Sequence, residues 1–254
     1  MKLSADIACA SCRGKVRSNN EDNLLFEGKI LDVGGGDLWP PQSAAHRLTE
    51  KPLLAALFDG MGGEENGEEA SFAAAKSLRE IAACRELDAN SLFRVSREMN
   101  AVVFARGREL MSSRMGTTMA MLLLGETETV VANLGDSPIY VLRGGKLHKV
   151  SRDHTDAEEM QRRGITNRKP YLTQYLGIDP EELLIEPYVA RVKTTPRDRI
   201  LLCSDGLTDM VPEQEIAGML GSAASAADAV AALTNAALNN GGRDNVTVLV
   251  AIVK

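Results

Sequence analysis

Two long helical segments follow one another in the first half of the chain, with short strand-like segments before and after them. Apolar residues recur at helical spacing between Ala70 and Ile81, and a second helical segment is predicted over residues 90–110. From residue 117 onwards, short apolar runs separated by Gly, Glu and Asp predict strands instead. Consecutive strands with helices grouped in pairs favour an α+β fold over alternating βαβ units. We therefore expect two antiparallel sheets with helices outside them.

Strands are predicted near both ends of the chain, and one long loop is predicted between them. Residues 34–52 are rich in Gly and Pro and are too many for a tight hairpin turn, so we expect a loop there. Residues 155–164 predict a short helix that Gly164 ends. The remaining strand predictions cover residues 3–10, 23–33, 53–58, 183–194, 199–203 and 245–254.

Length and charge narrow the class of protein. The 254 residues suit one sizeable domain, and 44% hydrophobic with 25% charged residues is typical of a globular chain. Lys and Arg number 29 against 35 Asp and Glu, a net charge of −6. A basic excess is usual in proteins that bind nucleic acid broadly, so we expect no such partner. An acidic excess suits a chain that gathers carboxylates around hard cations.

We expect a cytoplasmic protein with no membrane insertion. No apolar run approaches the ~20 residues that cross a bilayer, and the first residues contain no apolar core of a signal peptide. The four cysteines are unevenly scattered, which argues against a disulfide framework. Cys9 and Cys12 form a C-x-x-C pair, but a zinc site would need further ligands nearby. We interpret them as reduced cysteines at the end of the first strand, in preference to a zinc or redox motif.

Two predicted strands each end in Asp-Gly. Asp59 follows the apolar run 53–58, and Asp205 follows the run 199–203 after one serine. An Asp-Gly pair is often a simple turn, because both residues favour turn conformations. The alternative is a shared site for divalent cations, which prefer oxygen ligands and can be held about 3.5–4 Å apart around an attacking water. Three more acidic stretches lie near strand ends, at residues 17–23, 133–137 and 241–248.

The order of these motifs resembles one enzyme family. The segments are, along residues 4–253, VRSNNEDN, FDGMGG, MGTT, NLGDS, DH, LTQYLG, CSDGLTDMV and GGRDNVTV. They are similar to the metal-dependent protein serine/threonine phosphatases of type 2C, in the bacterial branch. The resemblance implies a four-layer α-β-β-α sandwich, with two antiparallel sheets flanked by helix pairs. It also implies a single catalytic domain over residues 1–254 with a flap segment at about 165–182.

The resemblance implies metal ligands at four matching positions. Asp59 would bridge two ions, and the carbonyl oxygen of Gly60 would bind one of them. Asp205 and Asp244 would complete the site of the other ion. The cofactor would be Mn²⁺ or Mg²⁺, because both ions accept such oxygen ligands.

Four further positions receive roles from the same resemblance. Asp136 matches a residue that supports a third, weaker ion together with Asp205. Glu21 and Asp22 match acidic residues that hold the waters of the ions. Arg17 matches the arginine that receives the substrate phosphate, and a guanidinium fork suits two phosphate oxygens.

The implied reaction is direct hydrolysis of phosphoserine or phosphothreonine by a metal-bridging water. Neither a phosphoenzyme nor a cysteine nucleophile is needed, and Cys203 is interpreted as a buried strand residue. Some relatives have a general-acid histidine where this chain has Met61, which cannot donate a proton. His154 is either a substitute or a hydrogen-bonded structural histidine. Pro138 stands where many relatives have arginine.

Other functions stay open from the sequence. The chain could be an inactive phosphatase-like module that docks phosphoproteins, a hydrolase of small phosphate esters, or a structural cation-binding protein. The expected partners are phosphorylated proteins, opposing a bacterial serine/threonine kinase, and the expected state is a monomer. Arg168 and Lys169 in the flap could meet a phosphopeptide or could be solvated charges on a loop.

Overall fold

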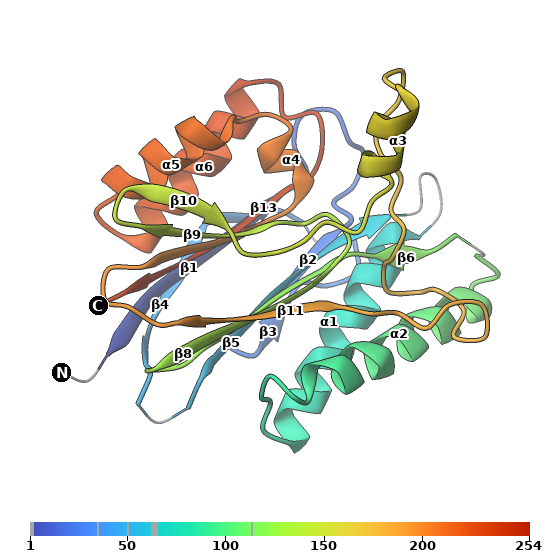
Figure 1. Ribbon diagram of the computed structural model, residues 1–254, viewed down its shortest axis with the longest axis horizontal. Coiled ribbons are helices and arrows are strands. Elements are labelled where there is room, and N and C mark those ends of the chain that lie inside the picture. The colour runs from blue at the N-terminus through green and yellow to red at the C-terminus, as the bar shows by residue number, and fades with distance from the viewer. Residues whose placement is uncertain (1–2, 35, 50, 62–65, 113) are drawn as a thin grey trace.

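The computed structural model describes residues 3–34, 36–49, 51–61, 66–112 and 114–254. Within these residues the strands form two antiparallel sheets, shown face to face in Figure 1. The first sheet has the order β10-β9-β12-β13-β1-β4. Its strands are β1 (Ser4–Cys12), β4 (Leu38–Arg47), β9 (Ile139–Arg143), β10 (Lys146–Lys149), β12 (Arg199–Cys203) and β13 (Val246–Val253).

The second sheet has the order β11-β8-β7-β5-β2-β3, and the short strand β6 pairs with the end of β5. Its strands are β2 (Asp22–Phe26), β3 (Lys29–Ile30), β5 (Leu53–Met61), β6 (Gly116–Thr117), β7 (Met119–Leu124), β8 (Glu128–Leu134) and β11 (Tyr188–Lys193). Strand β5 lies in the interior of this sheet, between β7 and β2. The Asp-Gly that ends β5 is therefore fixed by neighbours on both sides.

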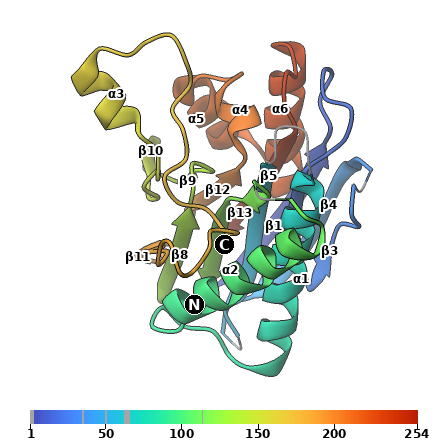
Figure 2. The same cartoon turned by 90° about the vertical axis from the view of Figure 1, so that its right-hand side faces the viewer.

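Helices cover the outer face of each sheet, as Figures 1 and 2 show from two directions. The helices are α1 (Gly67–Cys84), α2 (Leu92–Glu109), α3 (Ala157–Arg163), α4 (Asp205–Thr208), α5 (Glu213–Ser222) and α6 (Ala226–Asn239). Helices α1 and α2 pack on the second sheet, and α5 and α6 pack on the first. This arrangement confirms the predicted α+β, four-layer sandwich. No helix in the described ranges is long and apolar enough to span a membrane.

Three apolar layers hold the sandwich together. Strand β5 shows how one strand serves two of them, because Leu57 faces the layer between the sheets and Phe58 faces the layer under α1 and α2. Leu78 of α1 is fully buried in that second layer, as its helical spacing predicted. Successive side chains of a strand point to opposite faces, so an almost continuously apolar strand such as β5 must be covered on both sides.

The prediction of a loop at residues 34–52 is wrong over most of its length. Strand β4 lies there and pairs with β1 along the edge of the first sheet. Pro40 and Pro41 suggested a loop, but an edge strand tolerates proline because its outer backbone groups need no partner. Leu38 and Ala44 pack against the layer between the sheets, which gives the strand its apolar side.

Two other strand predictions need correction in their extent. Residues 23–33 are not one strand, because Glu27 and Gly28 have φ values of 49° and 71° and form a hairpin between β2 and β3. Two positive φ values are typical of a tight hairpin turn. Residues 183–187 precede β11 and do not belong to it. The helix predicted at 155–164 is confirmed as α3, and Gly164 ends it with a left-handed φ of 67°.

Candidate metal centre

The end of β5 is held rigidly by β6 and by the residue after it. The carbonyl oxygen of Asp59 accepts hydrogen bonds from the Thr117 hydroxyl and the Thr118 amide, each 2.9 Å long. The amide of Asp59 donates to the Thr118 hydroxyl over 3.1 Å. With both backbone groups satisfied, the carboxylate of Asp59 is presented at a fixed place at the edge of the sheet.

Gly60 occupies a position where no other residue fits. Its amide donates to the carbonyl oxygen of Glu21 over 3.1 Å. A Cβ atom at this position would lie 2.3 Å from the carbonyl oxygen of Gly67 and 2.4 Å from that of Glu21. Such contacts are with backbone and could not relax, so a glycine is required for the close packing of three segments. Residues 62–63 of the DGMGG motif lie outside the described residues.

Asp22 is a buried carboxylate beside Asp59. The two residues face each other in the register of β2 and β5, and Asp22 is 3% exposed. One carboxylate oxygen accepts hydrogen bonds from the hydroxyls of Ser204 (2.9 Å) and Thr247 (2.7 Å). The other oxygen has no hydrogen-bond partner among the described residues. Burial raises the pKa of Asp22 to about 6, so its charge needs a cation nearby.

Asp205 comes from the other sheet. Strand β12 ends at Cys203, and Asp205 begins the short helix α4. The next residue, Gly206, lies so close to the carbonyl oxygen of Asn245 that a Cβ would meet it at 1.9 Å. Burial, together with the charges of Asp136 and Asp209, raises the pKa of Asp205 to about 7. The charge of Asp205 also acts on Asp59. The Asp-Gly pair at the end of β5 and the one directly after β12 therefore lie at one edge of the sandwich.

Asp136 reaches the same edge from the turn after β8. Gly135 before it has a φ of +96°, and a Cβ there would lie 2.7 Å from the Thr118 side chain. Ser137 after it shares a 2.7 Å hydrogen bond with the Thr118 hydroxyl. The pKa of Asp136 is raised by burial and by the charges of Asp153 and Asp209. Thr118 thus positions both Asp59 and the Asp136 turn.

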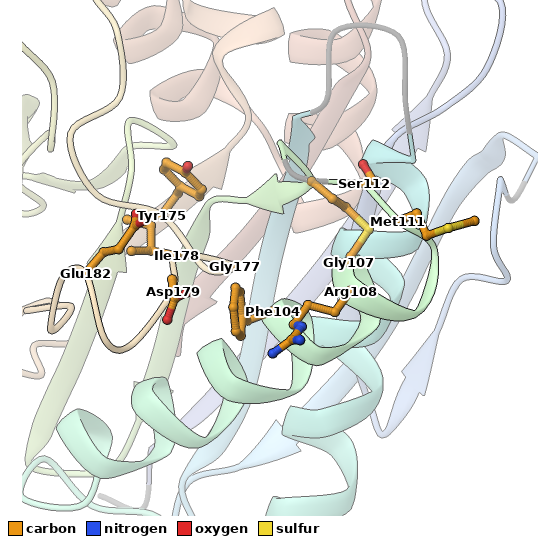
Figure 3. A pocket seen from close by; sticks show the side chains of 11 residues that line it. Phe104, Gly107, Arg108, Met111, Ser112, Tyr175, Gly177, Ile178, Asp179 and Glu182 are labelled. Atoms are coloured by element: carbon orange, nitrogen blue, oxygen red, sulfur yellow. The ribbon is translucent and has the colours of Figure 1, made fainter.

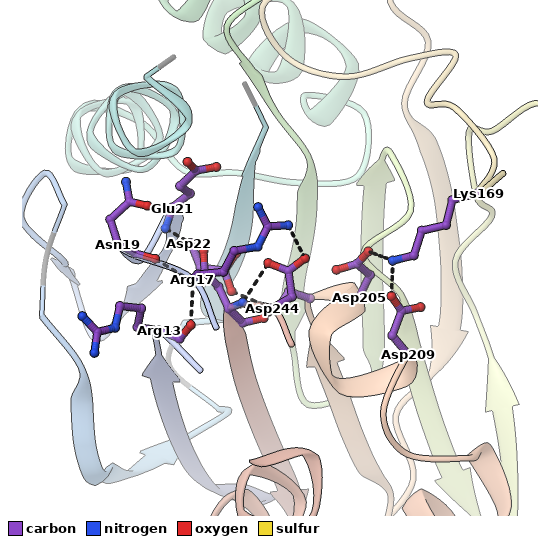
Figure 4. A network of polar contacts seen from close by, with 11 residues as sticks. Arg13, Arg17, Asn19, Glu21, Asp22, Lys169, Asp205, Asp209 and Asp244 are labelled. Atoms are coloured by element: carbon purple, nitrogen blue, oxygen red, sulfur yellow. Dashed lines mark hydrogen bonds and ion pairs between the residues drawn. The ribbon is translucent and has the colours of Figure 1, made fainter. Parts of the chain in front are cut away.

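Arg17 and Asp244 form an ion pair at the centre of the network in Figure 4. The Nη2 atom of Arg17 donates to Oδ2 of Asp244 over 2.6 Å. Arg17 lies on the loop between β1 and β2, and its side chain is 47% exposed. Its guanidinium therefore reaches solvent while one of its nitrogens contacts a carboxylate of the cluster.

A buried amide holds the loop that carries Arg17. Asn245 is 6% exposed, and its Nδ2 donates to the carbonyl oxygens of Arg13 (2.9 Å) and Asn19 (2.8 Å). Its Oδ1 accepts a 2.8 Å hydrogen bond from the amide of Glu21. Asn245, directly before β13, therefore binds three backbone groups on either side of Arg17, which is a structural role.

The carboxylates of the cluster repel one another and need cations. The pKa of Asp59 is raised well above its ordinary value by burial and by the charges of Asp22, Asp205, Asp136 and Asp244. Two protein cations partly balance this charge, Arg17 on Asp244 and Lys169 beside Asp205. As oriented here, no three His, Cys, Asp or Glu side chains in the described ranges converge on one ion position. The donors are oxygen atoms, and one Asp22 oxygen has no hydrogen-bond partner among the described residues. This set fits hard divalent cations, which carry more charge than a lysine or an arginine.

The structure brings the eight site residues of the sequence analysis to one edge of the sandwich. They are Arg17, Glu21, Asp22, Asp59, Gly60, Asp136, Asp205 and Asp244. Sequence reasoning missed Asp209, whose carboxylate contacts Lys169. The motif CSDGLTDMV contains Asp209, four residues after Asp205, and one helical turn places such residues on the same face.

His154 is a structural histidine in this conformation. Its Nδ1 accepts a 3.3 Å hydrogen bond from the amide of Gly135, and its own amide donates to the carbonyl oxygen of Gly135 over 3.0 Å. Burial lowers the pKa of His154. These contacts brace the turn that carries Asp136, and a histidine kept neutral by burial is a poor donor of a proton.

A separate cavity of about 670 Å³ lies between α2 and the flap segment. Figure 3 shows Phe104, Arg108 and Tyr175 among the side chains that line it. The cavity contains none of the clustered aspartates. Tyr175, which lines the cavity, packs against Gly116 of β6.

The sequence matches the family model of protein phosphatase 2C over residues 42–244. The chain belongs to the protein phosphatase 2C family. Serine/threonine phosphatase Stp of Listeria monocytogenes is 30% identical over 254 residues, covering 93% of this chain and 91% of that protein. Serine/threonine protein phosphatase PstP of Mycobacterium tuberculosis is 31% identical over 253 residues, covering 97% of this chain and 44% of that protein.

A solved structure supports the same assignment to protein phosphatase 2C. The catalytic domain of PstP in complex with two manganese ions is 29% identical to this chain. The TM-score is 0.77, and the match covers 99% of each chain. The likeness therefore extends over the whole sandwich and includes the edge where the carboxylates lie.

Proposed function

We propose that this protein phosphatase 2C is a metal-dependent protein serine/threonine phosphatase that releases phosphate from phosphoserine and phosphothreonine. The observation that carries the proposal is the convergence of five aspartates from both sheets on one edge, next to an arginine that reaches solvent. They are Asp22, Asp59, Asp136, Asp205 and Asp244, with Arg17 beside them. A structural role alone would not require so many mutually repelling carboxylates with an exposed arginine among them.

In this proposal, Asp59, the Gly60 carbonyl, Asp205 and Asp244 hold two core ions. Bound there, Mn²⁺ or Mg²⁺ would supply a water that is activated near neutral pH and would screen the phosphate charge. Glu21 and Asp22 would accept hydrogen bonds from waters around the ions. The buried oxygen of Asp22 that lacks a partner supports this role.

Arg17 is proposed to bind the substrate phosphate. Its guanidinium is half-exposed, and its present partner is the Asp244 carboxylate. With Asp244 engaged as a metal ligand, Arg17 would be able to turn toward phosphate oxygens and orient the ester. Met61 cannot supply a proton to the departing alcohol. His154 is held by its structural hydrogen bond to Gly135, so we assign that proton to solvent water.

The wider biological proposal follows the relatives. Phosphorylated proteins are the proposed substrates, a bacterial serine/threonine kinase is the proposed opposing enzyme, and the chain is proposed to act as a monomer. Residues 1–254 are proposed to form a single catalytic domain, with residues 165–182 as its flap. The cytoplasm is the proposed location, since all four cysteines are free thiols, as expected in a reducing compartment.

A comparison of substrates tests the proposed activity. Purified protein would be assayed for phosphate release from a phosphothreonine peptide, a phosphotyrosine peptide and a sugar phosphate, with Mn²⁺ or with EDTA. We expect release from the phosphothreonine peptide that requires Mn²⁺ and exceeds the other two rates. Faster release from the sugar phosphate would indicate a small-ester hydrolase. Peptide binding with no release in either metal would indicate a docking module.

A further inference from the structure

Lys169 of the flap segment crosses to α4 and contacts the carboxylates there. Its ammonium forms an ion pair with Asp209 and lies 3.7 Å from Oδ2 of Asp205. Figure 4 shows the three side chains pointing toward one another. Asp205 is also a proposed metal ligand. The lysine ammonium therefore lies beside a carboxylate that a divalent cation would otherwise neutralise.

Neighbouring contacts present Lys169 to this position. Arg168 forms a two-pronged ion pair with Asp156, and its guanidinium lies 3.9 Å from the centre of the Tyr171 ring. Arg168 also donates a 2.9 Å hydrogen bond to the carbonyl oxygen of Lys169 itself. Arg168 is therefore an anchor within the flap. Its neighbour Lys169 is left to extend toward α4.

The far end of the flap is attached as well. Leu176 exchanges two backbone hydrogen bonds with Thr117, of 2.9 and 2.8 Å, next to Gly60. Thr173 donates a 2.8 Å hydrogen bond to the carbonyl oxygen of His154. The segment is thus held by backbone hydrogen bonds at Thr173 and Leu176, and the Lys169 side chain extends from it to the carboxylates of α4.

We propose that Lys169 is an internal competitor for the divalent cation at the edge formed by Asp136, Asp205 and Asp209. This inference rests on the proposed metal-dependent function. A lysine ammonium is a single, mobile charge that partly neutralises the carboxylates when no ion is bound there. An incoming ion must displace it or bind beside it, so Lys169 weakens the binding of that ion most, and the core ion that shares Asp205 is affected less.

Mn²⁺ titration followed by electron paramagnetic resonance of free Mn²⁺ tests this directly. It would compare the wild-type chain with Lys169→Met, which removes the charge and keeps the length. We expect the weakest ion to bind about fivefold more tightly in Lys169→Met, the size expected from loss of one exposed ion pair. The Kd values of the tighter ions should change less than the Kd of the weakest ion. Lys169→Arg keeps a positive charge and should resemble the wild type.

Lys76→Met is the matched control, because Lys76 is an exposed lysine on α1. It should titrate like the wild type. An unchanged or weaker last Kd in Lys169→Met would overturn the proposal, and so would a Lys169→Arg protein that behaves like Lys169→Met. If the wild-type protein binds no Mn²⁺ at all, the proposed metal-dependent function itself fails. The two failures are therefore distinguishable, and neither depends on an activity assay.

Discussion

Among single residues, Asn245 links the loop that carries Arg17 to the core. Its three hydrogen bonds hold the backbone around Arg17, and none involves the Arg17 side chain. Asn245→Asp keeps the oxygen that accepts from Glu21 but loses both donors. We expect about a tenfold weaker inhibition by inorganic phosphate, because loosening the loop misplaces Arg17.

Mn²⁺ affinity and phosphate inhibition measured side by side separate this role from general damage. Asn240→Ala, which removes an exposed amide bonded to the Met210 carbonyl, is the control and should change neither quantity. Equal loss of Mn²⁺ and phosphate affinity in Asn245→Asp would mean that Asn245 supports the whole centre and not the Arg17 loop.

The cysteines allow a second test at this scale. Cys84 is exposed, whereas Cys9, Cys12 and Cys203 are buried, and burial raises the pKa of Cys9 to about 12. Thiolates are the reactive form, so a thiol reagent at pH 8 should modify one cysteine in the native protein and four after denaturation. Cys84→Ser should abolish the native reaction. Rapid native modification of Cys9 or Cys12 would contradict the interpretation of the C-x-x-C pair as structural.

The resemblance to a family pointed to eight candidate site residues, but it did not predict their contacts with one another. The ion pair of Arg17 with Asp244 and the contact of Lys169 with Asp209 depend on which segments the fold brings together. Lys169 lies in a segment with no helical or strand period, so no pattern in the sequence indicates its direction.

At the scale of elements, β4 shows where sequence patterns fail. Two prolines and several glycines around it predicted a loop, while the free edge of β1 favours a paired strand. Strands β5 and β12 were predictable because each is a short apolar run that ends in a turn residue. Strand β4 forms because it pairs with β1, which lies about 35 residues earlier in the chain. No feature of the sequence near β4 predicts this pairing.

Adjacent alanines in β4 test the strand and its orientation. Ala44 packs against the layer between the sheets, and Ala45 is exposed on the opposite face. Ala44→Asp should lower the free energy of unfolding by about 1–3 kcal/mol, because it places a carboxylate against apolar side chains. Ala45→Asp should change it by no more than about 0.5 kcal/mol. Urea denaturation measures both, and equal effects would contradict the alternation of a strand.

At the scale of the whole molecule, the charge of the cluster opposes folding when no ion is present. The pKa of Asp22 is raised to about 6 and that of Asp205 to about 7, so the folded chain binds protons more tightly than the unfolded chain. The stability of the metal-free protein should therefore fall as the pH rises from about 4 through 7.

Thermal unfolding of EDTA-treated protein at pH 5.5 and pH 8 measures this effect. We expect the higher Tm at pH 5.5, and excess Mn²⁺ at pH 8 should raise the Tm because ions bind the folded chain and relieve the repulsion. A metal-free Tm that increases toward pH 8 would mean that the carboxylates are balanced within the protein.

The architecture and the family were both predictable from the sequence, because the motifs extend along nearly the whole chain. The four-layer sandwich is confirmed by the sheets and by the solved structure of a relative at 29% identity. The balance of charge at the edge was not predictable, since it depends on burial and on distances between segments that are remote in sequence.

The rate of phosphate release from a phosphothreonine peptide with Mn²⁺, compared for the wild type, Asp205→Asn and Asp228→Asn, tests whether a metal centre lies at this edge. Asp228 is an exposed carboxylate on α6 and serves as the control. We predict that Asp205→Asn loses activity by about 100-fold or more, as expected when a metal ligand is removed, and that Asp228→Asn keeps the wild-type rate. Equal rates in all three proteins would contradict a metal centre at this edge of the sandwich.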